Sequence, residues 1–336
     1  MKLVASRGAS LRGEANIPGD KSCSHRALIL GALASGTTRI GGLLESDDVR
    51  ATARAVAALG ASVERVARGE WIVTGAAWTS PAEPIDCGNS GTSARLLLGA
   101  CAGVDGLRVT LTGDASLSKR PMRRVTAPLE RMGARFEGGE HLPTIVHGAK
   151  LGAIHHLNVP ASAQVKSALL LAGITSGAAV SVEEPVPSRD HTEIMLGQFG
   201  DPLAGCEIAI ASDPSSAAFA LVAAAIVPGS EVVVRGMLVN PLRTGLYEVL
   251  EEMGADLSLA NEHLRSGEIV ADMTLRHAPL TPCHVGPEQI AAMIDEIPAL
   301  AVACALADGE SVIEGLSELR VKESDRLGAM VAGLVA

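Results

Sequence analysis

The sequence predicts a mixed α/β protein of two domains, built from one unit that recurs along the chain. With 336 residues, the chain is longer than the roughly 100–200 residues of a typical single domain. Hydrophobic residues make up 47% of it, which is enough for a sizeable core. The same order of elements also recurs five times: a polar turn, an apolar helix, a glycine, a β-branched strand, a second polar turn and an amphipathic helix.

The five copies begin with polar residues, several of which suit a helix N-cap. They start at Ser22, Asn89, Ser162, Asp213 and Asp295. The apolar helices have almost no polar residues in Ala168–Ala172, Ala217–Val227 and Pro298–Ala307, so we expect them to be buried on most faces. The amphipathic helices, such as Thr244–Met253, are expected on the outside.

Glycines and short β-branched runs mark the ends of the helices and the strands. The amphipathic helices close at Gly60, Gly133, Gly200 and Gly254. A glycine at this position suits a left-handed C-cap. Strands are expected after the apolar helices, for example at Thr37–Ile40 and Ser311–Ile313. The fourth copy is short, because the chain between Gly200 and Asp213 has room for about one strand.

Composition and motifs disfavour several classes of function. Aromatic residues are only 2% and the formal net charge is −10, which disfavours binders of nucleic acids and of anionic membranes. The longest apolar runs, such as Ala217–Val227, are too short for a transmembrane helix of about 20 residues. Met1–Arg7 lacks the apolar segment of a signal peptide. The six cysteines form no CxxC pair, so we expect a cytoplasmic protein without a metal, disulfides or a cofactor.

Basic residues are concentrated in the polar turns. Thirteen of the 28 lysines and arginines stand there: Lys21, Arg26, Arg95, Lys119, Arg120, Arg123, Arg124, Lys166, Arg189, Arg243, Arg320, Lys322 and Arg326. Cations near helix N-termini suit a small anion, because free backbone N–H groups and the helix dipole favour phosphate or carboxylate. The alternative is that these side chains only solvate loops. Gly19–Ser22 resembles the end of a nucleotide P-loop, but Asp20 intervenes and Glu14 replaces the first glycine, so we reject a P-loop.

Two carboxylates lie beside cations or at the start of an apolar helix. Asp295 begins a helix that is otherwise apolar apart from the neighbouring glutamate, and Glu323 follows Lys322 in the segment Arg320–Arg326. Each carboxylate can serve as a general acid or base. Each can equally be a helix N-cap or a salt-bridge partner, and the sequence leaves both interpretations open.

Seven segments resemble one known family, in the family's order and over nearly the whole chain. They are Pro18–Arg26, Gly88–Thr92, Leu111–Asp114, Lys119–Met122, Asp213–Ala217, Asn240–Gly245 and Arg320–Arg326. On these motifs the chain resembles the 3-phosphoshikimate 1-carboxyvinyltransferases, also called EPSP synthases. Ala161–Ser167 and Ser188–Glu193 look most like the bacterial class II form.

The resemblance implies the two-domain enolpyruvyl transferase fold, an inside-out α/β barrel built from βαβαββ units. Residues 1–20 and 212–336 would form one domain, and residues 21–211 the other. The domains would close over the substrates at a two-strand hinge near Pro18–Lys21 and Ala211–Asp213. Members of the family are usually monomeric.

The implied reaction transfers the enolpyruvyl group of phosphoenolpyruvate to the 5-hydroxyl of shikimate 3-phosphate, by addition and then elimination of phosphate. By motif, shikimate 3-phosphate would be bound by Ser22, Arg26, Ser162, Gln164 and Arg189. Phosphoenolpyruvate would be bound by Lys21, Gly91, Arg120 and Lys322, with Asn89, Arg95 and Arg326 in or beside its site. Asp295 would be the base toward the 5-hydroxyl, Glu323 would handle the methylene proton, and Lys21 would share in catalysis.

The chain also departs from the family. Cys23 stands where isoleucine is usual, and Ser212 where glycine is usual. The fourth copy is short before Asp213, and the family's last unit, with its Asp-His-Arg motif, is not present. A chain that truly lacks this unit would turn over poorly and expose an apolar face. Glyphosate-tolerant class II members carry alanine at the turn of Gly91, so the glycine here predicts sensitivity to glyphosate.

Two alternatives remain from the sequence. The related UDP-N-acetylglucosamine enolpyruvyl transferases share the fold, but they typically have Lys-Asn where this chain has Lys21-Ser22, and they carry a reactive loop cysteine. A non-catalytic anion-binding remnant would bind shikimate 3-phosphate and release no phosphate from phosphoenolpyruvate.

Overall fold

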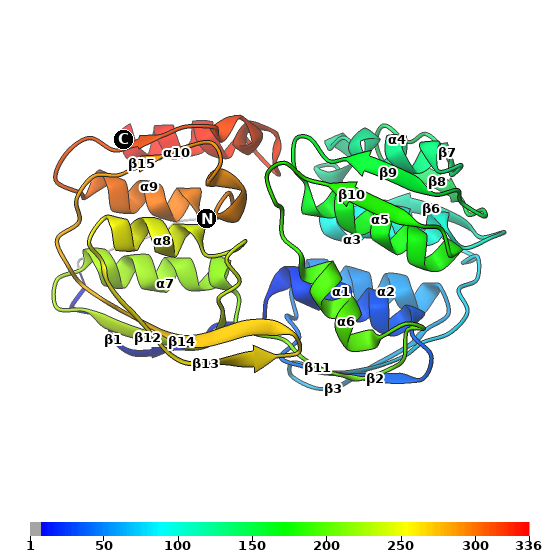
Figure 1. Cartoon of the computed structure of the whole chain (residues 1–336), viewed down its shortest axis with the longest axis horizontal. Helices are drawn as coiled ribbons and strands as arrows, with labels where there is room; N and C mark the ends of the chain where they lie inside the picture. Colours follow the sequence, from blue (N-terminus) through cyan, green and yellow to red (C-terminus); the bar gives the residue numbers. More distant parts are fainter. Residues whose placement is uncertain (1–7, 336) are drawn as a thin grey trace.

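The computed structural model describes residues 8–335, which form two regions that lie side by side (Figure 1). We call them the α1–α6 region and the α7–α10 region, after the helices that they contain. Met1–Arg7 and Ala336 lie outside the described residues. The signal-peptide prediction for Met1–Arg7 therefore concerns residues that the structure does not describe, as does the first part of the segment 1–20. No helix within the described part of the chain combines the length and the apolar character that a bilayer crossing demands.

The α1–α6 region contains three sheets and six helices. Its helices are α1 (Lys21–Leu33), α2 (Asp47–Ala58), α3 (Gly91–Ala102), α4 (Arg123–Arg131), α5 (Ala163–Ser176) and α6 (His191–Phe199). Its strands are β2 (Thr37–Gly41), β3 (Ser62–Ala67), β4 (Glu70–Thr74), β5 (Ile85–Asp86), β6 (Arg108–Thr112), β7 (Arg135–Glu137), β8 (Thr144–His147), β9 (Ile154–Leu157), β10 (Val180–Glu183) and β11 (Glu207–Ala209). Two sheets have four strands, in the orders β11-β2-β4-β3 and β5-β6-β8-β7, and the third has the parallel pair β10-β9.

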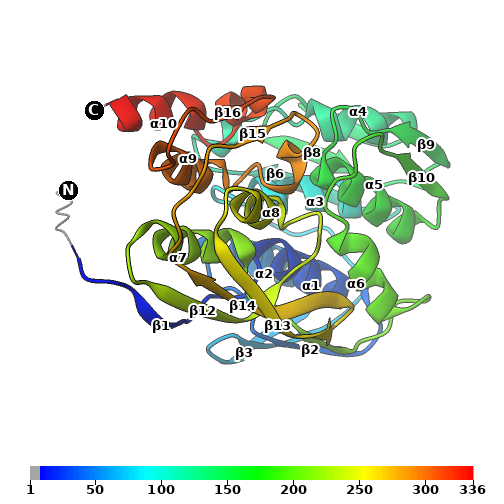
Figure 2. The ribbon, with the colours of Figure 1, turned by 60° about the vertical axis from the view of Figure 1, so that its left-hand side comes forward.

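The α7–α10 region is built around one large mixed sheet. Its helices are α7 (Pro214–Ile226), α8 (Gly245–Glu252), α9 (Ile297–Ala305) and α10 (Arg326–Val335). Its strands are β1 (Arg12–Ala15), β12 (Glu231–Leu238), β13 (Asp256–Arg265), β14 (Glu268–Arg276), β15 (His284–Val285) and β16 (Val312–Ile313). The sheet β1-β12-β14-β13 lies on one side of α7 and α8, and α9 and α10 lie on the other (Figure 2). Because β1 pairs in parallel with β12, Arg12–Ala15 belongs to this region although it precedes α1 in the sequence.

Two large clusters of buried apolar side chains form the cores. One runs from Cys23 to Ile210 and the other from Ala217 to Leu319. With so few aromatic residues, the cores depend on close contact between Ala- and Leu-rich helices. For example, a Cβ atom on Gly99 of α3 would lie 2.0 Å from the Ala168 carbonyl oxygen of α5, so the glycine lets these two helices touch.

The predicted repeat is confirmed by the order of the helices. The apolar helices are α1, α3, α5, α7 and α9, and each is followed by its partner, α2, α4, α6, α8 or α10. The short segment before Asp213 holds the single strand β11, as expected. The expectation that Pro298–Ala307 is buried on most faces is wrong: Val302 and Leu306 are 42% and 64% exposed, because α7, α8 and α10, which pack against α9, leave part of its surface uncovered.

The helix predicted at Thr244–Met253 lies deeper than expected. Only its glutamates, Glu248, Glu251 and Glu252, are exposed. The reason is that α9 and a turn of 3₁₀ helix, η2 (Ile290–Ala292), pack against α8.

Two chain segments cross between the regions, Pro18–Lys21 and Ala211–Asp213. Gly19 and Ser212 form an antiparallel bridge at the crossing. A Cβ atom on Gly19 would lie 1.9 Å from the carbonyl oxygen of Gly42, so the close approach requires a glycine. Each segment then runs directly into a helix, α1 in one region and α7 in the other.

Candidate active site

A crevice of about 610 Å³ opens between the two regions. Thirteen of the fourteen site residues expected from the sequence line it: Lys21, Ser22, Arg26, Gly91, Arg95, Arg120, Ser162, Gln164, Arg189, Asp295, Lys322, Glu323 and Arg326. The exception, Asn89, lies behind Arg120. The turns that are far apart in the sequence therefore meet in one place.

Three apolar helices begin at the crevice. Asp20 caps α1 by accepting a hydrogen bond from the Cys23 backbone N–H (2.7 Å), and Ser90 caps α3 in the same way. Ser162 stands at the N-cap position of α5 without a side-chain capping bond. The first turns of these helices carry backbone N–H groups without intrahelical partners and the positive end of the helix dipole, which favours an anion in the crevice.

Arg26 is a buried cation held by neutral groups. It is only 3% exposed. It donates to the hydroxyls of Thr192 (2.7 Å) and Ser167 (2.6 Å) and to the backbone oxygen of Ser22 (3.0 Å). Burial lowers the pKa of Arg26, since none of these acceptors offsets its charge. A guanidinium fixed in this way suits an incoming anion.

Arg95 and Arg120 form a second cluster of positive charge. Arg95 donates to the Gln164 side chain over 2.7 Å, and Arg120 donates to Asn89 over 2.5 Å. Burial, together with the charges of Arg120 and Arg124, lowers the pKa of Arg95 to about 10. Asn89 therefore positions Arg120 from behind. The mutual repulsion of the guanidinium groups favours an anion between them.

Asp295 faces this cationic side of the crevice from the α7–α10 region. Arg189 donates to its Oδ2 atom over 2.7 Å and Arg326 to its Oδ1 atom over 3.0 Å. Burial alone would raise the pKa of Asp295, but Arg189, Lys322 and Arg326 hold it well below its usual range. The N-cap of α9 is Glu296, so the N-cap interpretation of Asp295 is wrong. Asp295 forms salt bridges with Arg189 and Arg326, and its role as an acid or base stays a prediction.

Glu323 takes part in a further set of ion pairs. It pairs with Arg326 and lies 3.7 Å from the Arg120 guanidinium across the crevice. Burial would raise the pKa of Glu323, yet a backbone hydrogen bond and Arg326 bring it below its usual value. Arg124 and Glu318 make another pair across the crevice, at 3.1 Å. These contacts join the two sides of the crevice through charges of opposite sign.

The two sides of the crevice differ in charge, and we name them accordingly. The cation wall comes from the α1–α6 region and carries Lys21, Arg26, Arg95, Arg120, Arg124 and Arg189. The carboxylate wall comes from the α7–α10 region and carries Asp213, Asp295, Glu318 and Glu323 beside Arg243, Lys322 and Arg326. The cation wall also holds Asp48, which pairs with Lys21.

Several residues depart from the sequence analysis. Lys166, counted there among the turn cations, binds Glu184 (2.8 Å) and Glu193 (2.9 Å) and does not line the crevice. Asp213 and Glu318 line the crevice but were not singled out from the sequence as site residues. For Asp213 a signal exists, because it precedes an apolar helix as Asp20 does; for Glu318 there is none.

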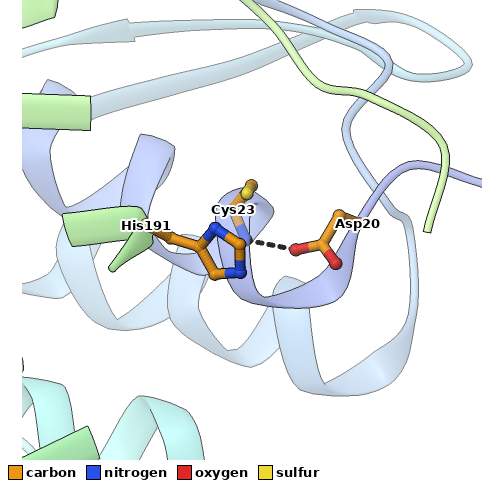
Figure 3. A group of neighbouring side chains, drawn as sticks. All are labelled: Asp20, Cys23 and His191. Carbon is orange, nitrogen blue, oxygen red and sulfur yellow. Dashed lines mark hydrogen bonds between the residues drawn. The ribbon is translucent and has the colours of Figure 1, made fainter. Parts of the chain in front are cut away.

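A buried trio near the crossing has the residue types of a metal site. Ligand atoms of Asp20, Cys23 and His191 lie within 4.8 Å of one another (Figure 3). Their atoms already have partners, since Asp20 accepts from the Cys23 N–H and from Arg243, and His191 bonds to Arg243 and Glu268. A cation here would meet the positive guanidinium of Arg243, so the trio does not suit a metal ion.

Comparison with known proteins identifies the family. The model of the EPSP synthase (3-phosphoshikimate 1-carboxyvinyltransferase) family matches residues 5–335. A Phenylobacterium zucineum protein named 3-phosphoshikimate 1-carboxyvinyltransferase is 51% identical over 356 aligned residues, which cover 99% of this chain and 78% of that protein. The chain belongs to the EPSP synthase family. The resemblance drawn from the sequence motifs is thereby confirmed.

Solved structures agree with this EPSP synthase family assignment. An EPSP synthase from Acinetobacter baumannii superposes with a TM-score of 0.85 at 42% identity, over 97% of this chain and 78% of that one. The enolpyruvyl transferase NikO from Streptomyces tendae has a TM-score of 0.69 at 15% identity, over 90% of this chain and 74% of that one, which shows the fold alone. The predicted fold class, a mixed α/β enolpyruvyl transferase fold, is confirmed.

Proposed function

We propose that the crevice holds shikimate 3-phosphate and phosphoenolpyruvate side by side, and that there the chain carries out its family's reaction. In that reaction the enolpyruvyl group passes to the 5-hydroxyl of shikimate 3-phosphate and phosphate is released, a step of the shikimate pathway. One observation carries the proposal: a wall of cations faces a wall of carboxylates in one crevice. Two highly charged anions need the first wall, and proton transfer needs the second.

Shikimate 3-phosphate is assigned to the deep part of the cation wall. Its five proposed ligands are Ser22, Arg26, Ser162, Gln164 and Arg189. Arg26 supports this assignment, since its guanidinium is buried and its protein partners are all neutral. All five residues belong to the α1–α6 region. This substrate can therefore bind to that region alone.

Phosphoenolpyruvate is assigned to the space between the walls. Its proposed ligands are Lys21, Gly91, Arg120 and Lys322, with Arg95 and Arg326 beside them and Asn89 holding Arg120 in place. Lys322 and Arg326 come from the carboxylate wall, whereas Lys21, Gly91, Arg95 and Arg120 come from the α1–α6 region. Burial, together with Arg189 and Arg326, lowers the pKa of Lys322, which supports an anion as its missing partner. This substrate needs both regions.

The proton transfers are assigned to the carboxylates. Asp295 takes the proton of the 5-hydroxyl as its oxygen attacks C2 of phosphoenolpyruvate. When the substrate anions draw Arg326 and Arg120 away from Glu323, its pKa rises, and the protonated form gives a proton to C3. In the second step C3 returns a proton to Glu323, the double bond forms again, and the C2–O bond to phosphate breaks. The proton that Asp295 took passes to the leaving phosphate, which departs as hydrogen phosphate. Lys21 steadies the negative charge of the reacting phosphate. When a substrate phosphate draws Arg189 away, the pKa of Asp295 rises and Asp295 becomes a better base.

The two regions are proposed to be the two domains of the family, 21–211 and 1–20 with 212–336. Their separate cores and the pairing of β1 with β12 support this division. We also propose that the chain works as a monomer in the cytoplasm. Members of the family are usually monomeric, and the six cysteines are free thiols in this structure, which supports a reducing compartment. Glyphosate is proposed to compete for the phosphoenolpyruvate site at Gly91.

Titration calorimetry tests this assignment. Shikimate 3-phosphate should bind one to one, and UDP-N-acetylglucosamine should give no heat of binding. An Arg26→Lys variant should weaken the binding, whereas Arg123→Lys, on an exposed ion pair outside the crevice, should leave it unchanged. Binding of the UDP sugar in preference to shikimate 3-phosphate would favour the alternative transferase.

A further inference from the structure

Arg243 joins the two chain crossings from inside the protein. Its side chain is only 2% exposed. It donates to Asp20 over 2.6 Å, to Asp213 over 3.2 Å and to the Ser215 hydroxyl over 3.0 Å. Asp20 caps α1 and Asp213 caps α7, so one guanidinium binds the caps of the first helix of each region.

A second connection runs through His191. Arg243 also donates to the Nε2 atom of His191 over 3.1 Å. A guanidinium has no acceptor, so Nε2 accepts, and the other ring nitrogen, Nδ1, carries the proton and donates to Glu268 over 2.6 Å. His191 lies in α6 of one region and Glu268 in β14 of the other. The buried network therefore ties the two regions together twice.

The partners of Arg243 lie close in sequence to residues of the proposed site or contact a neighbour of such a residue. Asp20 precedes Lys21, and His191 follows Arg189 by two positions. Ser215 donates to Glu296, which is the neighbour of Asp295. A shift of the guanidinium would thus move groups on both walls of the crevice relative to one another.

We infer that Arg243 is a positioning residue, which holds the cation wall and the carboxylate wall at the separation that the reaction needs. The inference rests on the proposed function, because it uses the division of ligands between the walls. Shikimate 3-phosphate takes its ligands from one wall, so its binding should not depend on Arg243. Phosphoenolpyruvate and the proton transfers use both walls and should depend on it.

The test is the Arg243→Lys variant, which keeps the charge and loses the forked hydrogen bonding. We expect its KM for phosphoenolpyruvate to rise at least tenfold and its kcat to fall at least tenfold. The dissociation constant of shikimate 3-phosphate alone should stay within twofold of the starting protein. Arg65→Lys is the matched control, since Arg65 binds Glu45 within one region and outside the crevice. It should change none of these constants.

A purely structural role predicts a different result. The variant would then melt at a lower temperature, while the folded fraction kept its KM and kcat, and that result would overturn the inference. If Arg243→Lys does not fold, Asp213→Asn decides, because it removes the charge from one partner of Arg243 and keeps a capping oxygen. It should show the same pattern to a smaller degree, and unchanged constants would overturn the inference. If the unsubstituted chain did not bind shikimate 3-phosphate, that result would instead contradict the proposed function.

Discussion

The two walls of the crevice are built from the same repeated unit but carry different chemistry. On the cation wall, Lys21 and Gly91 stand in the first turns of α1 and α3, where the backbone itself attracts anions, and Arg95 follows in the second turn of α3. On the carboxylate wall, Asp295 and Glu323 stand in irregular segments before α9 and α10. In the proposed function the difference separates two tasks, since one wall is assigned to the binding of anions and the other to the transfer of protons.

Charged side chains of the two walls also neutralise each other. Ion pairs cross the crevice from Arg189 to Asp295 and from Arg124 to Glu318. In the proposed function, dianionic substrates would replace the carboxylates as partners of the arginines and free the carboxylates for chemistry. Substitutions on the cation wall should therefore weaken substrate binding, whereas substitutions on the carboxylate wall should slow turnover.

The largest expected effect is on turnover, at the carboxylate wall. Glu323→Gln should lower kcat about 10²- to 10⁴-fold, because the amide cannot exchange a proton with C3. The KM values should change much less. Steady-state kinetics checks this, with Glu318→Gln as the control, since Glu318 lies on the same wall but has no proposed role in proton transfer. Equal losses in both variants would contradict the division between the walls.

The helix starts of the cation wall were predictable because their signals are local. A polar cap, a cation and an apolar run are adjacent in the sequence, as at Asp20–Arg26. The pairs across the crevice were not, because Arg124 and Glu318 are 194 positions apart. Arg243 and its partner Asp20 are 223 positions apart in the sequence. The turn that holds Arg243 therefore predicts a cation but does not predict which carboxylates this cation binds. The exposure of α9 was missed because apolar composition does not say how many neighbours a helix has.

The next effect concerns stability, and it compares the two cap carboxylates. Burial alone would raise the pKa of Asp20, but Arg243 holds it well below its usual range. Burial and the charge of Asp20 raise the pKa of Asp213 to about 6. The depressed pKa of Asp20 contributes stability above its unfolded value of about 3.9, and this stability is lost as the pH falls through the folded pKa. The raised pKa of Asp213 has the opposite sign, so its ionised form costs stability, and the cost fades as the pH falls from about 6 to about 4.

Asp20→Asn should therefore lower the free energy of unfolding by about 3 kcal/mol at pH 7. The loss should shrink toward pH 3, where the carboxylate contributes less. Asp213→Asn should cost less than about 1 kcal/mol at pH 7, because removing this charge relieves a carboxylate that is costly to ionise. Urea unfolding at pH 7 and at pH 4 measures the change for Asp213→Asn, and unfolding at pH 7 and at pH 3 measures the change for Asp20→Asn. Equal losses of unfolding free energy in the two variants would show that the two cap carboxylates do not differ in their contribution to stability.

A smaller effect is expected on binding, at the cation wall. Arg120→Lys should raise the KM for phosphoenolpyruvate about 10- to 100-fold, since lysine loses the forked hydrogen bonding. The affinity for shikimate 3-phosphate should not change. Steady-state kinetics and calorimetry measure the two, and Arg123→Lys, on an exposed pair with Glu130, is the control. A fall in kcat without a rise in the KM for phosphoenolpyruvate would contradict a binding role for Arg120 and would assign it to turnover, as proposed for the carboxylates.

The smallest effect is expected at Gly91. A Cβ atom here would lie 3.0 Å from a terminal nitrogen of Arg95 and 3.3 Å from one of Arg120, both at the ends of flexible side chains. Gly91→Ala should therefore raise the inhibition constant of glyphosate about tenfold and the KM for phosphoenolpyruvate less. Gly197→Ala is the control, because nothing lies within 4 Å of its added Cβ atom. Inhibition that does not compete with phosphoenolpyruvate would contradict the assignment.

Release of inorganic phosphate tests the joint action of the two walls most directly. The chain is mixed with phosphoenolpyruvate and either shikimate 3-phosphate or UDP-N-acetylglucosamine, and free phosphate is followed over time. We predict one phosphate for each phosphoenolpyruvate consumed, only in the presence of shikimate 3-phosphate. Binding of shikimate 3-phosphate without any release, or release driven by the UDP sugar, would contradict a crevice that both holds these two anions and joins them.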